Sequence, residues 1–468
     1  MASGTFVTFN KKQPGVYFNR KVMKRVNTNQ AIEGVVLYPF DLDWGTRDKI
    51  IEISSLQDCF NKLGYYYTDE KMRPIVEMFR GSNRTQGASK VEVIIPSVSG
   101  QAKASATIGT GKDKLTATAK CYGTRGNDIT FAIIPDLDTE ITTDVYAVYK
   151  VQTLVGNIVV SSKTYGSFTS STVYTQAKIG DLQSNDFLEW GGDKNGLLTA
   201  TAGTTLTGGV SASPSDAEMS TVLDAVDDHF FNVLCYDGTS STVKSAFNNF
   251  VMRQWENKGY YCQLVTSQFD GDFEGLTSIQ NGMILSDGFT LTPEKATWWY
   301  SGCTAGAKSS ESLTHIQHPL AVDVTKTYTS DELDQFIDNG QIVFIKEFDV
   351  VMVMKDINTL HTFTDEKGQD LSSNKLVRAL NEICNYCNYQ YNIYYVGDVP
   401  NDESGYDLLQ GNILGKLRNM AANRAIKNVE TDDVVINPVE GDSEAIEMLI
   451  GIQGVGSIEK IYIRLTSY

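Results

Sequence analysis

The chain has 468 residues, with 40 Lys and Arg against 57 Asp and Glu, a formal net charge of −17. This length accommodates several domains. The acidic balance argues against nucleic acid as the main partner, because binding to phosphate backbones relies on basic surfaces. With four His in the whole chain, few proton carriers or metal ligands are available for a hydrolase or a metalloenzyme.

The N-terminal 25 residues predict an extended, basic arm. Thr5 to Phe9 alternates like a strand, and the turn signal Pro14-Gly15 precedes a second short strand. An edge strand docked on its own domain is the alternative. The residues expected to pair with another subunit are Thr5, Phe6, Val7, Phe9, Val16, Tyr17 and Phe18.

An α/β domain is predicted from two separated segments, residues 26–96 and 207–328. Strands alternate with amphipathic helices, as in the helix expected over 215–230 and the strand over 231–235, which implies parallel pairing with right-handed crossovers. Residues 97–206 are instead rich in Thr and in short alternating runs. We therefore expect a β-rich domain inserted into the α/β domain.

A C-terminal α+β domain is predicted over 329–457. Thr329 and Glu332 have the spacing of a capping box, a hairpin follows, and helices are expected over 373–391 and 406–428. Residues 458–468 form a second arm that alternates as a strand. Its pairing residues are Glu459, Lys460, Ile461, Tyr462, Ile463, Arg464 and Leu465.

The seven Cys, an odd number, fit reduced thiols better than a disulfide framework. The first ten residues lack the features of a signal peptide, and no 18 consecutive residues are apolar. We therefore expect a soluble protein that is neither exported by the usual route nor inserted directly into a membrane.

No motif in the chain predicts catalysis or a cofactor. Residues 109–112 lack the spacing of a phosphate loop, and Cys384 and Cys387 lie in a helical pattern without a second zinc pair. His315 and His318 lack the Glu of a zincin helix. We expect neither an enzyme nor a bound cofactor.

A possible calcium loop begins at Asp270. Asp270, Asp272 and Glu274 copy its first ligand positions, but Asn281 occupies the place of the bidentate Glu. A solvated loop without an ion is therefore the preferred interpretation.

The two strand-like arms indicate self-assembly. An arm paired with the sheet edge of another copy would form about five to eight backbone hydrogen bonds, each worth about 1 kcal/mol net. Such head-to-tail pairing does not close between two copies, so it produces rings or helical polymers.

Several short motifs stand out along the chain: Pro14-Gly15-Val16-Tyr17, Leu206-Thr207-Gly208-Gly209, Ser301-Gly302-Cys303-Thr304-Ala305-Gly306, Ser312-Leu313-Thr314, Lys355-Asp356-Ile357-Asn358-Thr359-Leu360, Thr362-Phe363-Thr364 and Asn374-Lys375-Leu376-Val377-Arg378. Together they resemble tail sheath proteins of contractile phage tails, and look closest to those of myophages and R-type bacteriocins of Gram-positive bacteria. Cys303 stands where an aliphatic residue is expected, and the insert has no distinctive motif.

The resemblance implies a structural subunit that forms six-fold rings, stacked helically around a tail tube in an extended metastable state. The arms would add strands to neighbouring subunits, and contraction would drive the tube through the target envelope without nucleotide hydrolysis. Implied partners are other copies of the chain, the tail tube protein, and baseplate and tail terminator proteins. The particle, a virion or a headless bacteriocin, would be assembled in the cytoplasm of the host bacterium.

Two finer expectations concern surfaces. The helix predicted over 406–428 is expected to face the tube through its basic residues, and the insert is expected to face outward. The basic residues are Lys416, Arg418, Arg424 and Lys427.

Two other functions remain open. A Thr-rich surface adhesin or fibre conflicts with the missing export signal. An acidic α/β enzyme conflicts with the missing catalytic residues.

Overall fold

The computed structural model describes residues 2–5, 15–18, 34–143, 145–365, 367–460 and 462–463. It contains two compact units, Met1–Ala31 and Ile32–Tyr468. In the smaller unit, β1 (Ala2–Thr5) pairs in parallel with β2 (Gly15–Phe18). Val16, Tyr17 and Phe18 thus lie in a strand, as predicted. Of the strand predicted over 5–9, Thr5 belongs to β1, whereas Phe6, Val7 and Phe9 lie outside the described residues.

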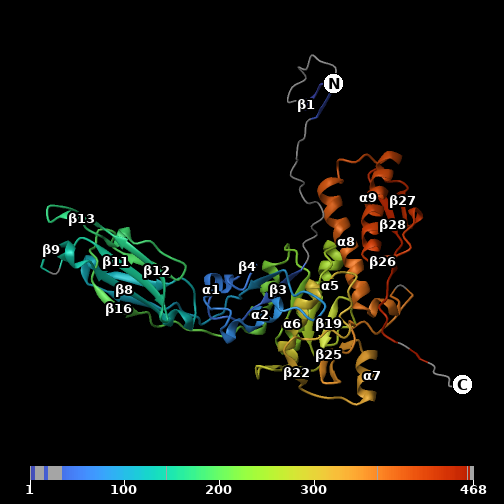
Figure 1. Ribbon diagram of the computed structural model, residues 1–468, viewed down its shortest axis with the longest axis horizontal. Coiled ribbons are helices and arrows are strands. Elements are labelled where there is room, and N and C mark those ends of the chain that lie inside the picture. Colours follow the sequence, from blue (N-terminus) through green and yellow to red (C-terminus); the bar gives the residue numbers. More distant parts are fainter. Residues whose placement is uncertain are drawn as a thin grey trace. The chain divides into compact units, whose positions relative to one another are not determined.

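A seven-stranded sheet forms the centre of the larger unit (Figure 1). All neighbouring strands pair in parallel except β4, which runs antiparallel at one edge. Most of these strands are buried on both faces. Val35–Pro39 is accordingly apolar throughout, whereas Gln263–Ser267 also contains buried polar residues. The predicted α/β alternation is confirmed. In sheet order the strands are β23 (Gln341–Ile342), β19 (Leu276–Ile279), β18 (Gln263–Ser267), β17 (Val233–Cys235), β3 (Val35–Pro39), β5 (Lys90–Ile94) and β4 (Ile50–Ile53).

Helices cover both faces of this sheet. Leu37, on one face, belongs to the hydrophobic cluster that includes α5 (Ser241–Arg253), whereas Val36 belongs to the cluster of α2 (Arg73–Phe79) and α6 (Pro293–Gly306). Successive strand residues therefore anchor opposite layers. The further helices of this region are α1 (Asp58–Leu63), α3 (Asp216–Ser220) and α4 (Val222–Ala225).

The single helix predicted over 215–230 is wrong, because α3 and α4 are separate short helices. At the break, the Ser220 hydroxyl donates to the carbonyl of Asp216 at 2.8 Å, and the Thr221 hydroxyl donates to the carbonyl of Glu218 at 2.8 Å. Such local bonds compete with the regular helix.

The small residues of α6 have a packing role. A Cβ on Gly302 would lie 2.0 Å from the Met78 carbonyl oxygen, and one on Gly306 would lie 2.3 Å from the Gln86 oxygen. These approaches allow α6 to contact α2 and the chain that follows it, which explains the small-residue run at 301–306.

Residues 97–209 contain two principal antiparallel sheets, which confirms their predicted β-rich character. Leu115, Ala117 and Phe131 are fully buried in the core. The four-stranded sheet has the order β12 (Ile158–Tyr165), β11 (Tyr149–Val155), β8 (Ile129–Pro135) and β16 (Thr201–Thr205); the three-stranded sheet has β15 (Leu188–Gly192), β7 (Leu115–Ala119) and β6 (Ser105–Ile108).

The C-terminal part begins with α7 (Ser330–Asp338), whose capping box between Thr329 and Glu332 is confirmed. A hairpin of β24 (Phe344–Glu347) and β25 (Val350–Val353) follows and contacts β22 (Ala321–Val324). Strand β23 joins the central sheet, although it lies beyond residue 329, the predicted start of the C-terminal domain. The neighbouring strands β20 (Met283–Leu285) and β21 (Thr290–Leu291) form a sheet with β22.

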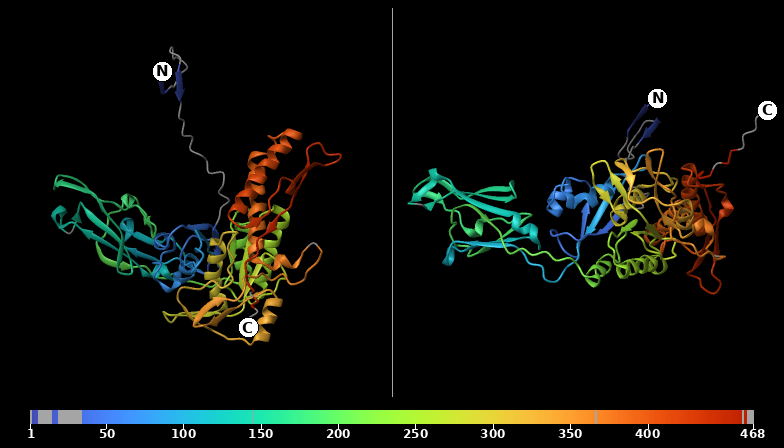
Figure 2. Two further views of the ribbon diagram at one scale, coloured as in Figure 1. Left: turned by 45° about the vertical axis from the view of Figure 1, so that its right-hand side comes forward. Right: turned by 90° about the horizontal axis from the view of Figure 1, so that it is seen from below.

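Two long helices, α8 (Asn374–Tyr394) and α9 (Glu403–Ala422), pack together with two small sheets (Figures 1 and 2). The prediction that the second helix reaches residue 428 is wrong. Arg424 adopts a left-handed conformation with φ 63°, which ends the helix and lets Ile426 turn back into the core. The small sheets pair β26 (Ile426–Lys427) with β29 (Gln453–Gly454) and β27 (Val434–Pro438) with β28 (Ile446–Ile450).

Candidate functional site

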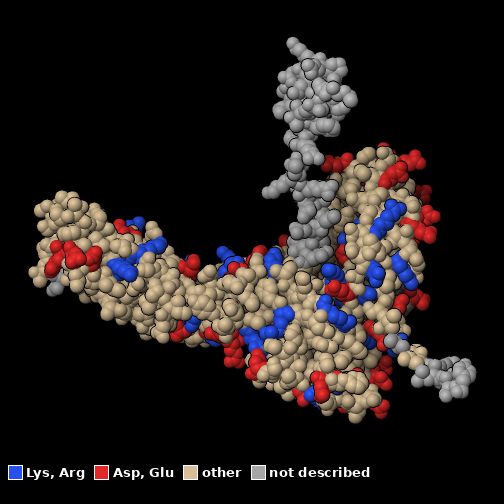
Figure 3. All heavy atoms as spheres, in the orientation of Figure 1, with Lys and Arg blue, Asp and Glu red and all other residues tan. Residues whose placement is uncertain are grey.

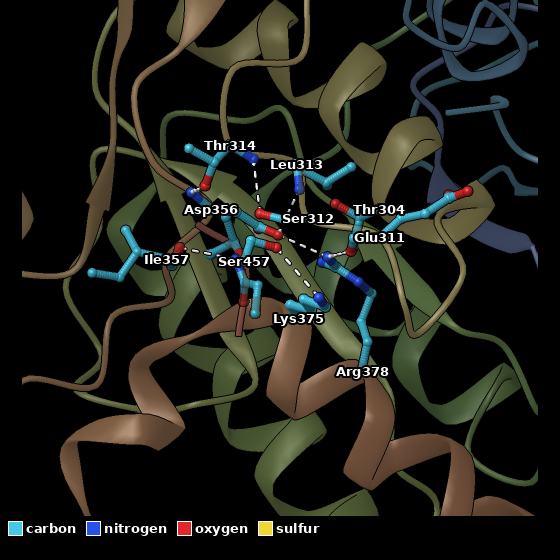
Figure 4. A network of polar contacts seen from close by, with 12 residues as sticks. Thr304, Glu311, Ser312, Leu313, Thr314, Asp356, Ile357, Lys375, Arg378 and Ser457 are labelled. Atoms are coloured by element: carbon cyan, nitrogen blue, oxygen red, sulfur yellow. Dashed lines mark hydrogen bonds and ion pairs between the residues drawn. The ribbon is translucent and has the colours of Figure 1, made fainter. Parts of the chain in front are cut away.

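Three of the sequence motifs meet at the buried carboxylate of Asp356 (Figure 4). Asp356 is 2% exposed. Its Oδ1 accepts a hydrogen bond from the Tyr300 hydroxyl at 2.9 Å, and its Oδ2 accepts from the backbone N–H of Leu313 at 2.9 Å and from Arg378 Nη2 at 2.7 Å. Because these donors come from α6, the loop after α6 and α8, one carboxylate joins the central domain to the C-terminal helices.

The charge of Asp356 is stabilised by its partners. Burial opposes ionisation, but the Arg378 guanidinium and the hydrogen bonds outweigh it and hold the pKa of Asp356 below its ordinary value. The Arg378 side chain is itself buried and also donates to the Glu311 carbonyl at 2.8 Å. The two buried charges are therefore paired, but among the described residues Arg378 Nε and Nη1 have no hydrogen-bond partner.

A second buried contact fastens the beginning of α8. Asn374 is fully buried and donates from Nδ2 to the Ile357 carbonyl at 2.9 Å. The same amide lies within hydrogen-bond distance of Thr277 in β19 and of Gln263 in β18. The start of α8 is thus held against the central sheet.

The C-terminal arm begins at this junction. The Thr314 hydroxyl accepts from the Asp356 backbone N–H at 2.9 Å and donates to Glu459 Oε1 at 2.9 Å. Lys375 Nζ donates to the Ser457 hydroxyl at 3.3 Å. Burial and the nearby Arg378 charge lower the pKa of Lys375. A recess of about 470 Å³ lies between these segments. The two hydrogen bonds of Glu459 and Ser457 attach residues 457–459 to the domain through side chains.

Beyond this attachment the arm is exposed. Ile458, Tyr462 and Ile463 have relative exposures of 87%, 88% and 76%. Among the described residues after 454, none lies in a strand paired within this chain. Lys460 is described and exposed, whereas Ile461, Arg464 and Leu465 lie outside the described residues.

The four basic residues predicted to face the tube do not share one helix. Lys416 and Arg418 lie on α9, but Arg424 follows the helix and Lys427 lies in β26. Lys416 Nζ forms an ion pair with Glu382 Oε1 at 2.6 Å and lies over the ring of Tyr386. Arg418, Arg424 and Lys427 are exposed.

The carboxylates of the possible calcium loop are bound by the chain itself. Asp272 Oδ1 accepts from the backbone N–H groups of His361 and Thr362 at 2.9 and 3.0 Å, and Glu274 pairs with Lys367 Nζ at 2.9 Å. Asp270 Oδ1 accepts from the Asp272 backbone N–H at 3.2 Å. The loop is therefore fastened to residues 361–367, which corrects the expectation of a solvated loop.

Asp272 predicts a specific acid sensitivity. Its partial burial favours the neutral form, but the hydrogen bonds from Thr362 and His361 outweigh this and lower its pKa to about 2. The stabilisation is present above the ordinary carboxylate pKa near 4 and disappears as pH falls toward 2. We expect Asp272→Asn to lower the free energy of unfolding at pH 7 by about 1 kcal/mol. Urea unfolding at pH 7 and pH 2.5 measures this; an equal effect at both values contradicts it.

The other candidate ligands also have structural partners. His318 Nε2 lies 2.9 Å from Glu77 Oε2, and both side chains are fully buried. Cys384 and Cys387 lie on α8, as predicted, and burial raises the pKa of Cys387 to about 12. Across the described ranges, no three His, Cys, Asp or Glu side chains are arranged to hold a metal ion. The described helices include none that is both long and apolar enough to span a membrane.

The pairing of Asp356 with Arg378 and the role of Tyr300 are not apparent from the sequence. Asp356 and Arg378 each lie in one of the motifs quoted above. The only signal for a buried Asp356 was its place directly before Ile-Asn-Thr-Leu. Their meeting depends on segments that are 22 residues apart in sequence, and sequence spacing does not determine such contacts.

Comparisons with known proteins identify similar sequences and structures over most of the chain. The family model described as "Phage tail sheath protein central domain" matches residues 212–359, and "Phage tail sheath C-terminal domain" matches residues 366–466. The sheath tail protein of Desulfitobacterium hafniense is 31% identical, with a TM-score of 0.77 over 96% of this chain and 99% of that one.

A further relative and a solved structure are also similar. The phage-like element PBSX protein XkdK of Bacillus subtilis is 28% identical over 99% of both chains. The contracted helical sheath of the anti-feeding prophage shares the fold, with a TM-score of 0.52 and 10% identity over 98% of this chain and 100% of that one. The resemblance seen in the motifs is therefore confirmed: the chain belongs to the phage tail sheath protein family and is a structural component of a phage tail or tail-like particle.

Proposed function

We propose that copies of this chain assemble head to tail into six-fold rings, which stack helically around a tail tube in an extended state and later contract. The observation that carries the proposal is the C-terminal segment, which is attached at Ser457 and Glu459 and then exposes Tyr462 and Ile463. Exposed apolar residues on an extended segment favour pairing with another chain. The match over nearly the whole length to sheath tail proteins supports this interpretation.

Each arm would add a strand to a neighbouring subunit. Strand addition uses backbone hydrogen bonds for affinity and alternate side chains for specificity. The arm residues named from the sequence keep this role in the proposal. The small sheets of the C-terminal part are the candidate acceptors, because each consists of two strands.

Contraction would require no nucleotide hydrolysis. A lattice with two packings can store free energy in the extended form and release it when a baseplate signal permits rearrangement. The tube and the tail terminator would be further partners, and the insert at 97–206 would face outward. A density map that places the insert against the tube contradicts this last assignment.

Negative-stain microscopy of the purified full-length chain tests the proposal. We expect long, hollow, striated tubes, formed above a threshold protein concentration. Uniform single particles at high concentration, with the chain folded by circular dichroism, would overturn it.

We further propose that Arg418 contacts the tube, because it is the exposed cation on α9, whereas Lys416 is held by Glu382. In co-assembly with the tube protein, Arg418→Glu should reduce tube-filled sheaths about tenfold, the effect of losing one interface anchor. Lys416→Gln, which removes an intramolecular pair, should instead lower the stability of the monomer. Normal sheathed tubes from Arg418→Glu contradict the assignment.

A further inference from the structure

The tip of the β24–β25 hairpin exposes an aromatic side chain. The strands pair Glu347 with Val350, so the turn consists of two residues, Phe348 and Asp349. Phe348 is 96% exposed. A phenylalanine this exposed is unusual, because such rings contribute most when they are buried.

The same turn is conformationally unfavourable for its residues. Phe348 and Asp349 have φ values of 48° and 63°. Two-residue hairpin turns with positive φ at both positions strongly favour Asn-Gly, and a bulky residue in this region is an outlier. The hairpin therefore carries a residue that neither burial nor turn geometry explains, which indicates a function outside the monomer.

The tip is also acidic. Glu347 and Asp349 flank the ring and are exposed, whereas the nearby Lys346 is directed to Asp323 at 3.6 Å. A matching surface must therefore combine an apolar recess for the ring with cations around its rim.

Such a recess lies where the insert leaves the α/β domain. It has a volume of about 360 Å³, and its apolar lining includes Trp44, Ile51 and Tyr122. Tyr122 is itself 43% exposed. Because Phe348 is almost fully exposed, it does not occupy this recess in its own chain. The four cations that line the recess are Arg47, Lys62, Lys103 and Lys120.

These cations are incompletely neutralised. Lys62 and Lys120 form ion pairs at 3.9 Å, with Asp58 and Asp186, at the limit of direct contact. Within the described part of the chain, Arg47 and Lys103 form no ion pair. Among the described residues, Arg47 Nη1 donates to the Leu42 carbonyl at 2.8 Å, whereas Arg47 Nε and Nη2 are buried without an acceptor. Lys103 lies over the Tyr122 ring.

We propose that the Glu347-Phe348-Asp349 tip of one copy inserts into this recess of another copy. The ring would fill the apolar floor, and the two carboxylates would meet the surrounding cations. Because tip and recess are different surfaces, the contact is heterologous and can repeat around a ring or along a helical polymer. The inference rests on the proposed self-assembly and adds a contact made by the folded body of the chain.

The turn provides a test with effects of opposite sign. We expect the variant Phe348→Asn with Asp349→Gly to raise the Tm of the monomer by a few degrees, because it restores the favoured turn. The same variant should raise the concentration needed for tube formation by about tenfold or more, as loss of an interface anchor does. Phe363→Asn, which alters another exposed phenylalanine, is the matched control. Assembly of the turn variant at the wild-type concentration would overturn the proposal.

The recess is tested separately. Lys103→Glu with Lys120→Glu should weaken assembly as the turn variant does, whereas Lys112→Glu with Lys150→Glu, on exposed residues of the insert outside the recess, should not. Under mild oxidation by copper-phenanthroline, Phe348→Cys should cross-link to Cys121 of another copy, and Cys121→Ser should abolish the product. Polymers without this cross-link would overturn the assignment of the recess. If the wild-type chain forms no tubes, the proposed function is refuted instead. The cross-link by itself then tests whether the tip of one copy contacts the recess of another.

Discussion

Deletion of residues 459–468 is expected to abolish polymerisation while leaving a folded monomer. The deletion removes the exposed segment that carries Tyr462 and Ile463, and with it a strand that would form about five to eight intersubunit hydrogen bonds at about 1 kcal/mol each. Within the monomer it removes one described side-chain bond, from Thr314 to Glu459. The free energy of unfolding should therefore fall by about 1 kcal/mol.

Sedimentation and electron microscopy measure the loss of polymer, and circular dichroism confirms that the monomer remains folded. Deletion of residues 1–20 should have the same outcome, because the N-terminal arm supplies the other strand. Glu459→Gln is the matched control for the C-terminal deletion, since it retains the arm and weakens its attachment. Polymers that persist after either deletion would refute the strand-exchange model.

Asp356→Asn should cause the largest loss of monomer stability, about 3–5 kcal/mol in the free energy of unfolding. The substitution leaves the buried Arg378 guanidinium without its ion pair and weakens the bonds from Leu313 and Tyr300. Because the junction joins α6 to α8, the C-terminal helices should also become more susceptible to proteolysis.

Two comparisons make this prediction specific. Thr314→Val, which removes a hydroxyl from the same junction, should cost about 1 kcal/mol. Adding Arg378→Met to Asp356→Asn should recover part of the loss, because the unpaired buried charge is then absent. The stabilisation by Asp356 is present above the ordinary carboxylate pKa and is lost as pH falls below it, because its folded pKa is lowered. A loss in urea unfolding no larger than that of Thr314→Val would contradict the role of this carboxylate.

Local patterns predicted several elements correctly. The capping pair Thr329 and Glu332 marks the start of α7, and the apolar runs that became β3, β5 and β18 lie in the central sheet. These features depend on periodicity and on side-chain bonds to nearby backbone, both of which are visible in a short window.

Helix ends were less predictable. The apolar periodicity continues past Ala422, but Arg424 turns into the left-handed region and Ile426 enters the core as part of β26. Tertiary burial overrides local propensity there. As a result, the four cations predicted to face the tube are divided between a helix, a turn and a strand.

The sequence by itself determined the α/β alternation, the β-rich insert, the family motifs and the presence of strand-like arms, because each is a local pattern of residue types. The tertiary structure alone decided that Asp356, Arg378, Tyr300 and Thr314 meet beside the origin of the C-terminal arm. It also decided that Lys416 is neutralised by Glu382 and that Phe348 is left almost fully exposed at the tip of its hairpin. Burial and ion pairing depend on contacts between segments that are distant in sequence. Neither composition nor residue spacing specifies which of these segments meet.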